Sequence, residues 1–147
     1  MAKWRAFASG LAGSVVLTVL HETARLIVPH APRMDVIGMR AIARPMREMD
    51  QEPPPRDQLY SLAMAGDLLG NAAYYSLVAL GNRERAGRRG FLIGTAAGAG
   101  AALLPPVLGL GRQPGARFPL THVLTVAWYL AGGLTAAAVY KRLAANA

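Results

Sequence analysis

The chain has 147 residues, 53% hydrophobic and only 16% charged, a composition that excludes a disordered chain and argues against an ordinary soluble enzyme. Its 16 lysines and arginines outnumber 8 acidic residues, but they flank apolar segments, so they indicate membrane topology and anionic headgroups rather than a nucleic-acid partner. There is no cysteine, which excludes a disulfide framework, thiolate metal ligands and cysteine nucleophiles.

Four apolar segments are long enough to cross a bilayer core, which takes roughly 20 residues of helix. We predict spans at about 4–28, 58–82, 90–110 and 118–140. The last two carry no charge, the second is interrupted once by Asp67, and the first includes His21, Glu22 and Arg25. The first and second spans are therefore apolar helices with polar side chains inside them.

A cleavable signal peptide is an alternative for the first span, because Lys3 and Arg5 precede an apolar stretch of suitable length. The residues HETAR that follow form a poor cleavage context, and apolar residues resume after them. We therefore expect the first helix to remain part of the protein.

The connection between the first two spans is too polar to cross the membrane. Within 33–50, apolar residues such as Met34, Ile37 and Met46 recur at helical spacing, with charged residues between them. This pattern predicts an amphipathic helix lying in the membrane interface, and a solvated loop is the alternative.

The two ends of such a bundle carry equal numbers of basic residues, so a count of lysine and arginine does not orient the chain. Four arginines crowd into the short connection NRERAGRR, whereas the long first connection mixes its arginines with acidic residues. We expect an integral protein of the plasma membrane, of the bacterial inner-membrane type, with both termini in the cytoplasm.

Small residues predict where the helices touch, because close backbone approach is a main source of helix association in lipid. The third span has Gly90, Gly94 and Gly98 at intervals of four. Such a row can close a monomeric bundle or join copies of the chain into a homo-oligomer or a larger complex, and the pattern does not choose between these uses.

Ionisable groups inside a span usually face the interior of a bundle, so Asp67 needs an explanation first. His21 lies seven residues before Val28, roughly 10 Å along a helix, and Asp67 lies eight residues after Leu59, roughly 12 Å. Both depths are measured from the same membrane face. The fourth span begins at that face, so His122 near its start lies in the same half of the membrane. We therefore predict a polar site in the extracytoplasmic half, formed by His21, Glu22, Arg25, Asp67, Asn71, Tyr74 and His122.

The chemistry of this predicted site leaves three interpretations open: a ligand pocket, a structural ion-pair network and an enzyme site. Histidine and aspartate can exchange protons while an amide and tyrosines fix a ligand, which favours a pocket for an ion, proton or small ligand, with transport as one use. Arg25 and His21 are also available partners for Asp67, in which case the cluster only fixes how two helices pack. No metal site is predicted, since the H-E-x-x-H and E-x-x-H spacings are absent. No cofactor and no catalytic residue is identified.

The predicted fold is a single all-α domain over 1–147, a polytopic transmembrane four-helix bundle with an amphipathic interfacial helix between its first two spans. The function that we expect is a small integral membrane protein with a buried polar pocket. An accessory subunit of a larger membrane complex and a membrane-embedded enzyme for a lipid-like substrate are the alternatives.

Overall fold

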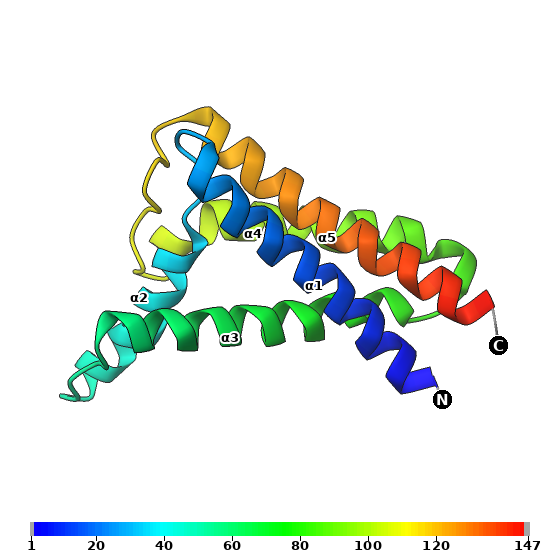
Figure 1. Ribbon diagram of the computed structural model, residues 1–147, viewed down its shortest axis with the longest axis horizontal. Helices are drawn as coiled ribbons and strands as arrows, with labels where there is room; N and C mark the ends of the chain where they lie inside the picture. The colour runs from blue at the N-terminus through cyan, green and yellow to red at the C-terminus, as the bar shows by residue number, and fades with distance from the viewer. Residues whose placement is uncertain (1, 146–147) are drawn as a thin grey trace.

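The computed structural model describes residues 2–145, which form helices and connections without any strand. The predicted domain also includes Met1, Asn146 and Ala147, which lie outside the described residues. Five α-helices follow one another along the chain, with two short 3-10 helices between α3 and α4 (Figure 1). Their bounds are α1 Ala2–Ile27, α2 Met34–Glu48, α3 Arg56–Tyr75, η1 Ser76–Ala79, η2 Arg83–Arg85, α4 Ala86–Val107 and α5 Pro119–Ala145.

The all-helical class is confirmed, and three of the described helices are long and apolar enough to cross a membrane. These candidate spans are Lys3–Ile27, Arg83–Val107 and Pro119–Ala145. The predicted span 58–82 instead forms α3 and the 3-10 turn η1, and it is not one of the three. Asp67 and Asn71 lie in the middle of α3, where polar residues lower its hydropathy.

Helix α5 lies between α1 and α4, and glycines allow the close contacts on both sides (Figure 1). Gly90, Gly94 and Gly98 of α4 are buried against α5. A Cβ atom on Gly94 would lie 2.9 Å from the Cα atom of Leu130, so the two backbones touch there. The glycine row of the third predicted span is thus used inside the protein, between α4 and α5.

Helix α3 crosses α1 near the end of the molecule that carries both termini, and the two helices diverge from that crossing (Figure 1). At the crossing Gly10 packs against the backbone of Ala72, and the Ser14 hydroxyl donates to the Leu68 carbonyl at 2.7 Å. Helix α2 packs against α3 in the space between the diverging helices. The crossing therefore creates a wedge between α1 and α3 that α2 partly fills.

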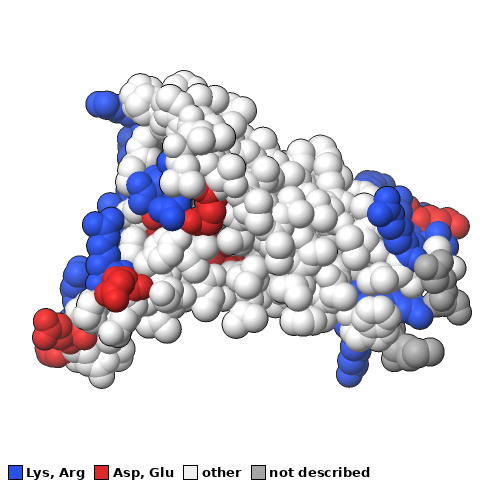
Figure 2. Space-filling model, viewed as in Figure 1, with Lys and Arg blue, Asp and Glu red and all other residues white. Residues whose placement is uncertain are grey.

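Charged residues gather at the two ends of the molecule and leave a broad, nearly uncharged belt between them on the face shown in Figure 2, which we call the apolar belt because of the side chains exposed on it. Many large apolar side chains are exposed, among them Phe7, Val19, Leu69, Phe91 and Val123. An apolar surface of this extent is expected where lipid, not water, surrounds the helices.

We expect Gly94→Ala to lower the free energy of unfolding by about 2 kcal/mol, because its methyl group must push α4 away from α5. Gly70→Ala on α3 is the matched control, since a Cβ atom there meets nothing within 4 Å. Its effect should be neutral, or stabilising by up to about 1 kcal/mol. Thermal unfolding of the purified variants in detergent measures both effects, and equal destabilisation would contradict the packing described.

Candidate functional site

A small cavity of about 20 Å³ lies in the wedge between α1, α2 and α3. All three helices contribute side chains to it. The lining residues are Thr18, His21, Glu22, Met34, Asp35, Ala63, Met64 and Asp67. One imidazole and three carboxyl groups thus surround a space that is large enough for about one water molecule.

His21 is 7% exposed and occupies the α1 side of the cavity. Its ring packs edge-on against Trp128 and Tyr129 of α5, with ring centroids 5.2 and 5.7 Å apart. Within residues 2–145, neither its Nε2 atom nor the Oγ1 atom of Thr18 has a hydrogen-bond partner. Buried polar atoms normally have hydrogen-bond partners, so these two unpaired atoms favour a small polar ligand, such as a water molecule, next to them.

Asp67 faces the cavity from α3 and is half-buried. Its Oδ1 atom accepts a hydrogen bond from Nδ2 of Asn71 at 2.9 Å, one helical turn further along. Arg25, considered above as a partner for Asp67, pairs elsewhere, and no ion pair of Asp67 is found in the described part of the chain. Asp67 is therefore held by a neutral amide.

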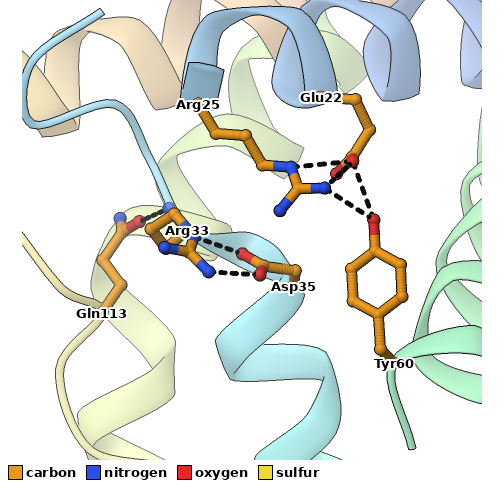
Figure 3. Close-up of polar contacts among 6 residues, drawn as sticks. All are labelled: Glu22, Arg25, Arg33, Asp35, Tyr60 and Gln113. Carbon is orange, nitrogen blue, oxygen red and sulfur yellow. Dashed lines mark hydrogen bonds and ion pairs between the residues drawn. The ribbon is translucent and has the colours of Figure 1, made fainter. Parts of the chain in front are cut away.

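Arg25 belongs to a second polar group beside the cavity, which joins α1 to α3 (Figure 3). It forms an ion pair of 2.6 Å with Glu22, and Tyr60 of α3 donates to the same carboxylate at 2.7 Å. The Arg25 guanidinium also lies 5.5 Å from the centre of the Tyr60 ring. Glu22 thus faces the cavity with its charge already balanced.

The third polar group ties the start of α2 to the cavity (Figure 3). Arg33 donates to both carboxylate oxygens of Asp35, at 2.9 and 2.7 Å, and the Asp35 side chain is only 5% exposed. The Arg33 backbone N–H donates to the side chain of Gln113 in the connection between α4 and α5, at 3.1 Å. Burial alone would raise the pKa of Asp35, but the hydrogen bonds and charge of Arg33 outweigh burial, so the pKa lies below its ordinary value.

Two predicted site residues lie apart from the cavity. His122 of α5 contacts the Ala116 carbonyl through Nε2 at 2.8 Å and lines a separate cavity of about 360 Å³ with Pro105 and Gln113. Tyr74 donates to the Ile93 carbonyl of α4 at 3.0 Å. Of the seven predicted residues, the structure therefore brings His21, Glu22 and Asp67 to one cavity, with Arg25 and Asn71 as their partners.

Thr18, Asp35 and Tyr60 are the site residues that the sequence interpretation missed. Thr18 lies three residues before His21, so helical spacing was a signal that could have placed it on the same face. Tyr60 lies 38 residues from Glu22, and no spacing rule connects them. Across residues 2–145, no three His, Asp or Glu side chains lie close enough together to hold a metal ion.

We expect Asp35→Asn to destabilise the protein by about 1 to 2 kcal/mol at pH 7. This value lies between the typical losses for an exposed and for a buried ion pair, because Asp35 is buried while Arg33 is partly exposed. Because the folded pKa of Asp35 lies below the unfolded one, the ion pair stabilises at neutral pH and this contribution is lost as the pH falls below about 4. The difference between wild type and variant in thermal unfolding should therefore shrink in acid. Asp50→Asn, an exposed acid with no ion pair in the described residues, should change stability by less than about 0.5 kcal/mol.

No protein-family model matches the chain, and neither does any curated protein or solved structure. The cavity and its side chains are thus the basis for a functional proposal.

Proposed function

We propose that the protein is a small integral membrane protein whose cavity between α1, α2 and α3 binds a proton, with His21 and Asp67 as the exchanging groups, and that this binding serves the movement of protons across the membrane. The observation that carries the proposal is the meeting of one buried imidazole and three carboxyl groups around a single cavity of about 20 Å³. Chains of Asp, Glu and His inside membranes are typical of proton relays.

The size and charges of the cavity favour a proton over the other ligands considered. A cavity that holds about one water molecule is too small for an organic solute. Glu22 and Asp35 are each paired with an arginine, which leaves His21 and Asp67 as the groups whose charge is not balanced by a neighbour. The cavity that both line has room for one water molecule, which would serve as the bridge for proton transfer.

The proposed membrane arrangement has α3 as a fourth crossing helix and α2 in the interface. α3 and η1 together run from Arg56 to Ala79, and Leu62, Leu69 and Leu77 are exposed along them. The end with both termini carries Lys3, Arg5 and the arginines of 83–89 with Glu84 as its one acid, whereas the α2 end mixes both signs. This asymmetry favours termini in the cytoplasm of a bacterial inner membrane and a cavity in the extracytoplasmic half.

An accessory subunit of a larger membrane complex is the second candidate function, and the specific observation in its favour is on α3. Gly66 and Gly70 are four residues apart, and a Cβ atom on either would meet nothing within 4 Å. Rows of this kind allow close helix contact in lipid. Here the row is free for another chain or a second copy, whereas Gly90, Gly94 and Gly98 of α4 are already covered by α5.

The decisive variant for the proton pocket is Asp67→Asn, which keeps the shape of the side chain and removes its exchangeable proton. In proteoliposomes with an imposed pH gradient, we expect the wild type to move protons and Asp67→Asn to lose at least about 90% of that flux. A positioned acid or base typically accelerates proton transfer by more than about tenfold, so its loss should slow the flux by at least that factor. A pH-sensitive dye inside the vesicles measures the flux.

Asp57→Asn is the matched control, because it removes an exposed carboxylate from the same helix outside the cavity and should leave the flux unchanged. Thermal unfolding of each variant shows whether it is folded. If folded Asp67→Asn carries wild-type flux, or if the wild type carries none, the proton proposal is wrong and the cluster has a packing role.

A further inference from the structure

A groove much larger than the proton cavity lies at the end of the molecule opposite the termini. It has a volume of about 1040 Å³ and lies between α2, the proline-rich connection before α3, the start of α3 and the connection between α4 and α5. Pockets for small molecules usually measure about 300 to 1,000 Å³. The groove therefore has room for a group far larger than water.

Four arginines line the groove, and two of them, Arg40 and Arg44, are held by hydrogen bonds to other parts of the chain. Arg40 donates to the carbonyls of Leu110 and Arg112 at 3.1 and 2.9 Å, and Arg44 donates to the Leu108 carbonyl at 2.7 Å and to Glu48 at 2.6 Å. These bonds fix α2 to the connection between α4 and α5 and make one wall rigid.

Arg47 and Arg56 form no ion pair and no side-chain hydrogen bond within the described residues, although both line the groove. Glu48 is balanced by Arg44, so Glu52 is the one lining carboxylate left to oppose the remaining arginines. The groove thus has a net positive charge, with two guanidinium groups free to bind an anion. Arginine binds phosphate oxygens with paired hydrogen bonds, which suits a phosphate group.

The rest of the lining is apolar and lies where a lipid could reach it. Val36, Met39, Leu59 and Leu110 line the groove between the arginines. Val107 and Leu108, just before the lining residue Gly109, are 80% and 61% exposed. In Figure 2 this end of the molecule is where the charged residues border the apolar belt, the level at which headgroups lie in a bilayer.

We propose that this groove binds an anionic membrane phospholipid, with its phosphate between Arg47 and Arg56 and its acyl chains passing over Leu110 and Leu108 toward the apolar belt. The occupant is a membrane lipid and not a soluble phosphate, because a free phosphate would leave the apolar lining unused. The site depends on membrane embedding but not on the proton cavity, whose residues do not line it.

Native mass spectrometry of the delipidated protein, titrated in detergent with phosphatidylglycerol, tests the proposal. We expect the double variant Arg47→Gln, Arg56→Gln to weaken lipid binding about tenfold or more, since it removes the two groove guanidinium groups that would hold the phosphate by paired hydrogen bonds. Arg83→Gln, Arg85→Gln is the matched control: it removes the same charge from exposed residues at the other end and should bind as the wild type does.

Equal loss of binding in both double variants, or in neither, would overturn the proposal. So would binding of glycerol 3-phosphate as tightly as the lipid, because the groove would then be a site for soluble phosphate. Asp67→Asn should keep full lipid binding, so a failure of the proton proposal and a failure of this one give different results.

Discussion

The contact between α1 and α3 at Gly10 and Ser14 is the constraint on which the rest of the structure depends. Without a side chain at Gly10, the two helices meet backbone to backbone, and the Ser14 hydroxyl fixes the contact by its bond to the Leu68 carbonyl. Further along, the two helices diverge, and α2 packs against α3 in the wedge between them. Polar groups that would be expensive in lipid are collected in this wedge, where they can satisfy one another.

A second set of contacts holds the wedge in shape from the side of α5. The Thr121 hydroxyl lies 2.7 Å from the His30 carbonyl and 2.8 Å from the Gly115 carbonyl, and Gln113 accepts from the Arg33 backbone. The turn between α1 and α2 is therefore anchored on the connection between α4 and α5. This anchoring fixes where α2 begins, and so it places Asp35 at the cavity.

The sequence predicts the helices well because proline, glycine and charged residues mark their ends, and it predicts the level of His21 and Asp67 because depth follows from the rise per residue. Depth does not determine toward which neighbouring helix a side chain points. His122 lies at the same end of the molecule as His21 and Asp67 but lines a different cavity. Arg25, a candidate partner for Asp67 from the sequence, pairs instead with Glu22, which lies one turn away on the same helix. Tyr60 and Asp35 required knowledge of how α2 and α3 pack, which an amphipathic pattern does not contain.

The residues on the two sides of the cavity differ in their exposure to the surroundings. Toward the termini, the helices pack around a core that contains Leu17, Tyr75 and Val78, each with 0% of its surface exposed, and Tyr75 donates to the Tyr129 carbonyl at 2.8 Å. On the other side lie Glu22 and Arg25, whose side chains are 29% and 30% exposed. Under the proposed proton function, this exposure favours exchange with water from the α2 end. Under the same proposal, release toward the opposite face would require α3 to shift relative to α1. Because α3 has few contacts with α4 and α5, the crossing at Gly10 and Ser14 is a contact that such a movement would change.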